Sequence, residues 1–335
     1  MRVLVTGGSG FVAHHVINKI VRDTDWEIVV IDRSDRTKEL NRLAYILNHE
    51  ISSIEQKRIK IINHDLKNDF SPIDSQIGKL DYIFHIAASA DVDLSIREPT
   101  GAIVNNVLAS VNLLNYARTQ ENLKRFFNFS SGEVFGPAPG NIKYKDNDRY
   151  NSANPYSASK AAVEEIAVSY FNSYNLPVVI THTMNIFGER QHQARYIPSS
   201  IRKIRNDEVV MIHGNKDKTM PGSRQYLHAE DVAEAVLFLT KFNDFGETWG
   251  GARCPKFNVA GTQDLNNFEL AEYIAEALNK TLKYEMVDFH SSRPGHELRY
   301  SLDTTKILNL GWKPKPIKER VQRVVDWFSA NPEWL

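Results

Sequence analysis

The sequence predicts an α/β fold in which helices cover both faces of a mainly parallel β-sheet. Through the first half of the chain, short apolar segments typical of buried strands alternate with longer segments of helical periodicity. A glycine-rich turn separates the first strand-like segment from the first helical one. With 335 residues, the chain can bury a large core as one big domain or as two unequal lobes.

The first unit is a strand over residues 2–6, a turn over 7–10 and a helix from 11 to about 22. Gly7 permits the tight turn from strand to helix. Gly10 has no side chain to hold a pyrophosphate away from the N–H groups of the helix N-terminus, where the helix dipole favours negative charge. The unit therefore predicts a dinucleotide site.

The second strand, residues 27–31, ends on Asp32. The Asp32 carboxylate is at the right distance along the chain to accept hydrogen bonds from the adenosine ribose, and it would repel a 2′-phosphate. Arg33 follows directly and would offset part of that repulsion. We therefore expect a Rossmann-type, doubly wound parallel sheet that binds NAD rather than NADP. A βαβ unit that binds no dinucleotide is the weaker interpretation.

The next elements continue this alternation. The pattern predicts a helix over about 36–50, strands over 59–62 and 81–85, a helix over 99–117, a strand over 125–129, a helix over 155–173 and a strand over 177–181. In such a sheet, ligands bind beyond the carboxyl ends of the strands. We therefore expect further cofactor contacts from the start of the first helix and from the residues after the third and fourth strands: Phe11, Val12, Asp65, Leu66, Ala87 and Ala88.

Beyond about residue 185 the alternation loosens. Helical segments near 196–206, 230–241, 266–278 and 316–329 are separated by short strands and loops. We expect an NAD-binding domain over 1–184 and, over 185–335, mainly a smaller α/β lobe that binds the substrate. Residues 224–241 are expected to return to the large sheet.

Composition narrows the class of protein. The 41 basic and 41 acidic residues balance, so the whole chain shows no charge pattern for nucleic acid or an anionic membrane. The single cysteine, Cys254, excludes an intrachain disulfide and a cysteine metal cluster, and the histidines lack metal-ligand spacing. No signal peptide or membrane-spanning apolar run is recognisable, so we expect a cytoplasmic protein.

A group of reactive side chains follows the strand that ends at Phe129. Ser130, Ser131 and Glu133 come first, and Tyr156 and Lys160 follow some 20 residues later, four apart and so on one helix face. A lysine ammonium beside a phenol lowers the phenol's pKa, and the phenolate can take a proton from a sugar hydroxyl while the carbon gives hydride to a nicotinamide. A Ser130 or Ser131 hydroxyl would bond the same oxygen.

Together these motifs resemble the extended short-chain dehydrogenases/reductases that act on nucleotide sugars, most closely the dTDP-glucose 4,6-dehydratases. The resemblance covers nearly the whole chain. It is carried by residues 6–11, Ala87-Ala88, 92–96, 133–136, 155–161, 185–188, Glu230-Asp231, the run Arg293-Pro294-Gly295-His296-Glu297-Leu298-Arg299-Tyr300, and 311–314.

The resemblance implies a lyase with an internal redox cycle. Tyr156, assisted by Lys160, would deprotonate the C4 hydroxyl as hydride passes to NAD, and Glu133 would then remove the acidified C5 proton. Loss of the C6 hydroxyl as water and return of the hydride to C6 would give a 4-keto-6-deoxy sugar.

Gly132 departs from the family pattern, because the dehydratases carry there an aspartic acid that protonates the departing hydroxyl. Either Glu133 itself or a water held in the carboxyl's place would have to donate that proton. Alternatively, the enzyme performs C4 oxidation alone, epimerisation or decarboxylation of a uronic acid such as UDP-glucuronate. A non-catalytic NAD-binding regulator is the alternative from a different class of protein.

The resemblance also implies residues that bind the substrate. Asn185 would contact the sugar or its phosphate, Arg224 and Arg293 the pyrophosphate, Arg195 takes the place of a family lysine, and His296 is a further candidate. The stretch 215–223 is longer than in the thymidine-specific enzymes, which leaves UDP or GDP open as carriers. The helices over 99–117 and 155–173 resemble the pair that forms the dimer interface in this family, so we expect a homodimer.

Overall fold

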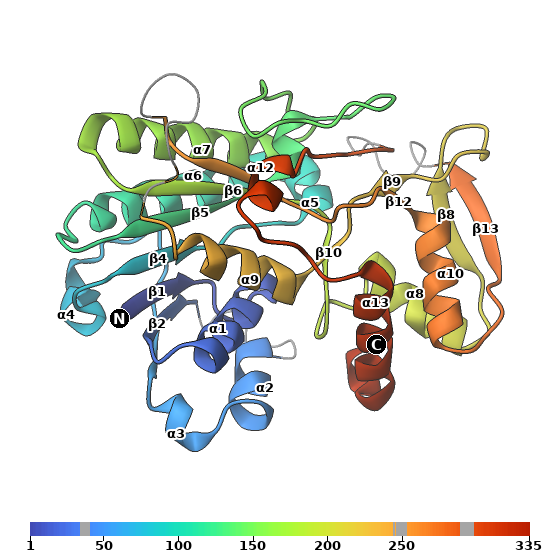
Figure 1. The fold of residues 1–335 in the computed structure, drawn as a ribbon, viewed down its shortest axis with the longest axis horizontal. Coiled ribbons are helices and arrows are strands. Elements are labelled where there is room, and N and C mark those ends of the chain that lie inside the picture. The colour runs from blue at the N-terminus through green and yellow to red at the C-terminus, as the bar shows by residue number, and fades with distance from the viewer. Residues whose placement is uncertain (34–40, 244, 246–252, 289–297) are drawn as a thin grey trace.

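A seven-stranded parallel sheet forms the centre of the molecule in the computed structural model, which describes residues 1–33, 41–243, 245, 253–288 and 298–335 (Figure 1). The strand order is β11-β6-β5-β4-β1-β2-β3, the doubly wound order expected of a Rossmann-type fold. The strands span Arg2–Thr6 (β1), Glu27–Asp32 (β2), Ile59–Asn63 (β3), Tyr82–His85 (β4), Arg125–Ser131 (β5), Val178–Thr183 (β6) and Lys256–Val259 (β11).

Helices cover both faces of this sheet. Figure 1 shows α6 (Pro99–Ala117) and α7 (Pro155–Tyr174) on one side, and α1 (Phe11–Asp23) and α9 (Ala229–Leu239) on the other. Each face buries its own apolar cluster, as the continuous apolar runs of the strands require. The fold class predicted from the sequence is thus confirmed.

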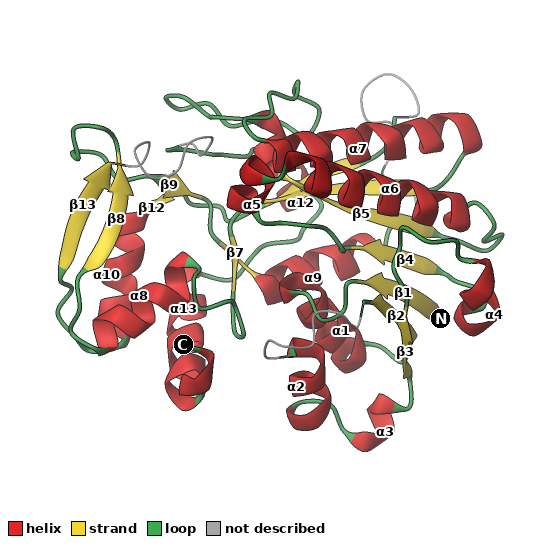
Figure 2. Ribbon diagram, turned by 180° about the vertical axis from the view of Figure 1, so that it is seen from behind, coloured by secondary structure: helices red, strands yellow, loops and turns green. Residues whose placement is uncertain are grey.

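A smaller lobe lies beyond the carboxyl ends of the strands, and the C-terminus lies in it (Figures 1 and 2). Its core packs α10 (Asn267–Ala277) and α13 (Ile317–Ala330) against α8 (Tyr196–Arg205). The strands β8 (Val210–Gly214) and β13 (Tyr284–Asp288) pair in parallel at its edge.

Short elements connect these layers. They are α2 (Arg42–His49), α3 (Ser53–Gln56), η2 (Ser71–Ile73), α4 (Asp74–Ile77), α5 (Val92–Arg97), η3 (Gly132–Phe135), β7 (Ile186–Phe187), β9 (Ser223–Arg224), β10 (Leu227–His228), β12 (Leu265–Asn266), α12 (Thr305–Asn309) and η4 (Pro332–Trp334). Within the described ranges, none of the helices combines the length and apolarity needed to cross a membrane.

The C-terminal half contributes more to the large sheet than the sequence indicated. Helix α9 packs against α1, and β11 joins the sheet by pairing in parallel with β6. No strand was expected from the sequence at β11, and the return of residues 224–241 to the large domain remains a prediction. The domain boundaries at residues 184 and 185 remain a prediction.

Candidate active site

The glycine turn after β1 leaves the backbone open at the N-terminus of α1. Gly7 has φ +72°, and its N–H donates to the Ile31 carbonyl at 2.8 Å. A Cβ on Gly7 would lie 3.0 Å from the Ala87 Cα, and one on Gly10 would lie 2.8 Å from the Gly7 oxygen. Both positions therefore require glycine, and an anionic group can approach the helix N-terminus closely.

Asp32 closes this turn from the end of β2. Its carboxylate accepts hydrogen bonds from the Ser9 N–H at 2.5 Å and from the Arg33 N–H at 2.7 Å. The Arg33 guanidinium lies 3.5 Å from the carboxylate of Asp65. Burial opposes ionisation of Asp65, but the backbone N–H and ammonium of Lys67, with Arg33, hold the Asp65 pKa below its usual value. Asp32 and Asp65 thus lie at one edge of the sheet, as expected.

The turn after β4 is fixed against the glycine turn. The Thr6 hydroxyl accepts the N–H groups of Ile86 and Ala87, both at 3.1 Å, and bonds the Nδ1 atom of His85 at 3.1 Å. The remaining expected cofactor residues belong to the same edge: Phe11 and Val12 begin α1, Leu66 follows β3, and Ala88 follows Ala87.

Tyr156 is the second residue of α7. The helix begins with Pro155 after an Asn154 cap, and the Tyr156 N–H donates to the Ser95 hydroxyl at 3.1 Å. Burial and the Glu133 carboxylate raise the pKa of the Tyr156 phenol, whereas a hydrogen bond with the Ser131 hydroxyl and the charge of Arg195 act in the opposite direction.

In this structure the net shift of the Tyr156 pKa is upward, because burial penalises the phenolate. Lys160 is not among the groups that lower this pKa, so the expected help of Lys160 to Tyr156 stays a prediction.

Lys160 is 4% exposed. Burial lowers its pKa to about 8, while the carboxylate of Glu164 acts in the opposite direction. No described residue accepts a hydrogen bond from the Lys160 ammonium. A buried cation without an acceptor is costly, so this site fits a ligand rich in hydroxyls, such as the ribose of a dinucleotide.

Glu133 lies on η3, directly after β5. Its carboxylate accepts a hydrogen bond from the Asn154 amide at 3.2 Å, and its N–H donates to the Ser131 hydroxyl at 3.2 Å. Ser130 differs from Ser131, because its hydroxyl is buried without a partner among the described residues. Of the two predicted serines, the geometry favours Ser131 as the one beside Tyr156.

The space beside Gly132 is filled by apolar side chains. A Cβ on Gly132 would lie 2.4 Å from the Met184 Cε and 2.9 Å from a methyl group of Leu302. Both side chains belong to a buried apolar cluster. A water held where the family's carboxyl would lie is therefore disfavoured, because it would lack polar partners there.

The predicted substrate residues are placed differently from one another. Arg195 is exposed at the start of α8, and its charge acts to lower the pKa of Tyr156. Asn185 is exposed in a left-handed conformation with φ +39°. The Arg224 guanidinium is mostly buried, donates to the Leu298 carbonyl at 2.5 Å and stacks on the ring of Tyr300 at 4.8 Å. The remaining two candidates, Arg293 and His296, lie outside the described residues.

Two residues that hold the proposed catalytic residues in place were not singled out from the sequence. Asn154 caps α7 and donates a hydrogen bond to the Glu133 carboxylate, and the Ser95 hydroxyl accepts one from the Tyr156 N–H. Asn154-Pro155 is a helix-start signal, so the cap was recognisable. Glu164 on α7 was also not singled out; its carboxylate accepts a hydrogen bond from His182, and no local pattern marks that contact.

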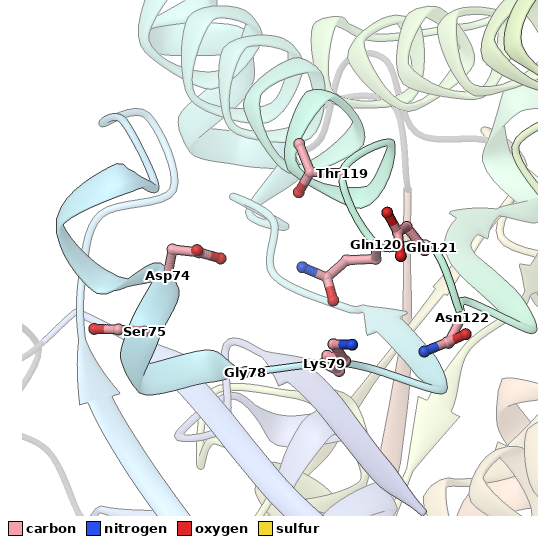
Figure 3. A pocket seen from close by; sticks show the side chains of 8 residues that line it. All are labelled: Asp74, Ser75, Gly78, Lys79, Thr119, Gln120, Glu121 and Asn122. Atoms are coloured by element: carbon pink, nitrogen blue, oxygen red, sulfur yellow. The ribbon is translucent and has the colours of Figure 1, made fainter.

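Other features of the surface do not belong to this site. The cleft of about 470 Å³ drawn in Figure 3 lies between the end of α4 and the end of α6, at the amino ends of β4 and β5. It is therefore at the opposite edge of the sheet. Within the described residues, no group of histidine, cysteine and carboxylate side chains is arranged to hold a metal ion.

Comparison with known proteins gives a consistent family. A family model described as GDP-mannose 4,6 dehydratase matches residues 4–324. A dTDP-D-glucose 4,6-dehydratase from Mus musculus is 31% identical over 98% of this chain and 89% of its own length.

Solved structures resemble the chain over its full length. A dTDP-glucose 4,6-dehydratase double mutant from Streptomyces venezuelae, crystallised with NAD, is similar with a TM-score of 0.83 at 25% identity, over 100% of this chain and 98% of its own. A UDP-N-acetylglucosamine 4-epimerase from Methanobrevibacter ruminantium M1 has a TM-score of 0.82 at 26% identity, over 98% of each chain. Enzymes of two reaction classes thus share this fold.

Proposed function

Because this chain belongs to the GDP-mannose 4,6-dehydratase family, we propose that it is an NAD-dependent nucleotide-sugar 4,6-dehydratase, a lyase that forms a 4-keto-6-deoxy sugar. One observation supports the proposal above others. The Tyr156 phenol, the Ser131 hydroxyl and the Glu133 carboxylate lie together at the same edge of the sheet as the glycine turn. A regulator that only binds NAD has no use for such a proton-transfer set.

The residues present fit a bound NAD. The open backbone at Gly7 and Gly10 suits the pyrophosphate, Asp32 suits the adenosine ribose, and the unpartnered ammonium of Lys160 suits the second ribose. The chemistry that NAD supplies when bound is hydride acceptance at C4 and hydride return at C6.

Tyr156 is the proposed base for the C4 hydroxyl. Its phenolate accepts the hydroxyl proton, and Ser131 donates a hydrogen bond to the same sugar oxygen. Because burial raises the pKa of Tyr156, its ionised form depends on nearby cations. Lys160 and Arg195 are the cations that this chain provides.

Glu133 is the proposed acid and base for the elimination. Its carboxylate removes the C5 proton that the C4 ketone has acidified, and then carries this proton to the departing C6 oxygen, which leaves as water. Glu133 then takes a proton from solvent and delivers it to C5 as the hydride returns to C6. Gly132 offers no second carboxyl, and Met184 and Leu302 fill its place. Glu133 therefore carries out these proton transfers.

A 4-epimerase is the second candidate, and the surroundings of Gly132 favour it. Epimerisation requires C4 oxidation and reduction from the opposite face but no proton for a leaving hydroxyl. An apolar filling at Gly132 is compatible with that reaction, as is the similarity to the Methanobrevibacter enzyme.

We further propose a homodimer that works in the cytoplasm. Helix α6 exposes Ile103, Val104 and Leu108 to between 40% and 48%, an apolar stripe that a second copy of the chain would cover. The family resemblance supports pairing through α6 and α7.

Cys254 is buried with its pKa raised to about 12, so a structural role suits it better than redox chemistry.

The reaction class can be tested by product analysis. The purified chain is incubated with dTDP-, UDP- and GDP-hexoses while absorbance of the reduced nicotinamide is recorded and product masses are measured. Loss of one water supports the dehydratase. Unchanged mass with turnover indicates the epimerase, loss of two hydrogens indicates simple oxidation, and binding without turnover indicates a regulator.

A further inference from the structure

Helix α7 buries two ionisable side chains one helical turn apart. Lys160 is 4% exposed and Glu164 is 0% exposed. Residues four apart on a helix lie on the same face, and their side chains are neighbours. This face of α7 packs on β5 and β6. A cation that we assign to the reaction and an anion that we have not assigned are therefore buried under the same helix.

The Glu164 carboxylate is held by three side chains. It accepts hydrogen bonds from the Nε2 atom of His182 on β6 at 3.0 Å and from the Tyr150 hydroxyl, and it pairs with the Nζ atom of Lys256 on β11 at 2.8 Å. Burial alone would raise the pKa of Glu164, but His182 and Lys256 hold it well below its usual value. The group is thus an anion fixed in one position.

Lys160 has no such hydrogen-bonding partners among the described residues. Its charge acts on His85 of β4, whose two ring nitrogens form hydrogen bonds with the hydroxyl groups of Thr6 and Ser110. Burial, together with the charge of Lys160, lowers the pKa of His85 to about 3, so His85 is neutral and neither repels nor attracts the ammonium as an ion. The influence that favours the charged form of Lys160 is the carboxylate of Glu164.

We propose that Glu164 is a positioning residue that holds the Lys160 side chain as an ammonium ion, ready to donate hydrogen bonds to the ribose of a bound dinucleotide. This inference rests on the proposed use of NAD. It assigns Glu164 no contact with the substrate. The ionisable groups that face the pair are His85 from β4, His182 from β6, Lys256 from β11, Cys254 just before β11, and Tyr150 from the loop before α7.

The test is the pH dependence of NAD binding. NAD is titrated into the full chain, freed of nucleotide, from about pH 6 to about pH 10, a range that spans the titration of a buried lysine. In the natural chain, affinity falls as Lys160 loses its proton near pH 8. In a Glu164→Gln variant, this midpoint moves down by about one pH unit, because a neighbouring opposite charge is removed.

A matched control and a second variant make the test specific. Glu276→Gln removes an acid of the small lobe whose side chain is 69% exposed and pairs with Lys318, so it leaves the midpoint unchanged. Lys256→Gln removes a cation that partly neutralises Glu164, so the midpoint moves up. If Glu164 and Lys256 only stabilised the fold, both substitutions would weaken NAD binding at every pH. They would not move the midpoint of its pH dependence in opposite directions.

An unchanged midpoint in a folded Glu164→Gln protein would overturn the inference. If that variant does not fold, an unchanged or lowered midpoint in Lys256→Gln overturns it instead. The titration needs no sugar, so its failure is distinguishable from failure of the dehydratase proposal, which the product masses test.

Discussion

Gly132 lies where the family resemblance leads us to expect a carboxyl group. Met184 and Leu302 fill the space beside it and belong to a buried apolar cluster. In the proposed reaction, Glu133 therefore serves as the single carboxyl group of this loop. Asn154 holds that carboxylate at 3.2 Å, so its position does not depend on the substrate alone.

The role of Glu133 can be tested by isotope incorporation. In a Glu133→Gln variant, we expect C4 oxidation to persist and elimination to fall by about 10²- to 10⁴-fold, because the amide can neither take nor return a proton. Solvent deuterium should no longer enter the sugar at C5. The exposed Glu165→Gln variant serves as control and should label normally. Normal labelling in Glu133→Gln would show that another residue is the base.

The packing at Gly132 can be tested through stability. Gly132→Ala should lower the free energy of unfolding by about 1–3 kcal/mol, because the added methyl meets the Met184 Cε. Gly101→Ala in α6 is the matched control, since nothing lies within 4 Å of its added Cβ, and it should stabilise by about 0.5–1 kcal/mol. Denaturant unfolding measures both. A neutral or stabilising Gly132→Ala would show that the space is open.

At the scale of elements, the structure joins the two lobes through buried ion pairs. Glu230 at the start of α9 accepts hydrogen bonds from the guanidinium groups of Arg320 and Arg323 on α13. Arg320 also pairs with Asp231. These contacts fix the C-terminal helix of the small lobe against the helix that packs on α1.

This junction predicts a pH-dependent stability. Burial alone would raise the pKa of Glu230, but Arg323 and Arg320 lower it to about 2, below its value in the unfolded chain. Between the pKa of Glu230 in the folded chain and its pKa in the unfolded chain, the unfolded chain binds more protons than the folded chain. The contribution of Glu230 to stability is therefore complete above about pH 4.5 and is lost as the pH falls toward 2.

Glu230→Gln should therefore cost about 3 kcal/mol at neutral pH, and this difference should shrink on acidification from about pH 5. Glu276→Gln removes one partner of an exposed pair with Lys318 and should change stability by less than about 0.5 kcal/mol. Urea unfolding at several pH values gives the comparison. A Glu230 difference that stays constant with pH would contradict the assignment.

Most elements were predictable because their signals are local. Helix α6 spans residues 99–117 as the periodicity predicts, and Pro155 marks the start of α7 one residue before Tyr156, the proposed catalytic tyrosine. Strand β11 was missed because it is four residues long and carries no pattern of its own. Its place in the sheet comes from pairing with β6.

The candidate site, too, has features with a local sequence signal and features without one. The glycine turn, Asp32 and the Tyr156–Lys160 spacing were recognisable, since each depends on neighbours in the sequence. The upward pKa shift of Tyr156 and the apolar filling at Gly132 depend on residues brought together only by folding. No local pattern contains them.

At the scale of the whole molecule, the exposed stripe on α6 predicts the oligomeric state. Val104, 48% exposed, lies in this stripe, and Val104→Asp should convert the proposed dimer to a monomer because a charge would be buried between the copies. Ile142→Asp changes an equally exposed apolar residue in a loop and should leave the dimer intact. Size-exclusion chromatography with light scattering measures the molar mass in solution of the natural chain and of both variants. A natural chain that elutes as a monomer would contradict the dimer.

In the proposed dehydratase reaction, the hydrogen removed from C4 of the sugar reappears at C6. The most direct test is therefore to supply a nucleotide sugar deuterated at C4 and to locate the label in the product. The account predicts a dehydrated product with deuterium at C6. Deuterium returned to C4, or left on the reduced nicotinamide, would contradict it.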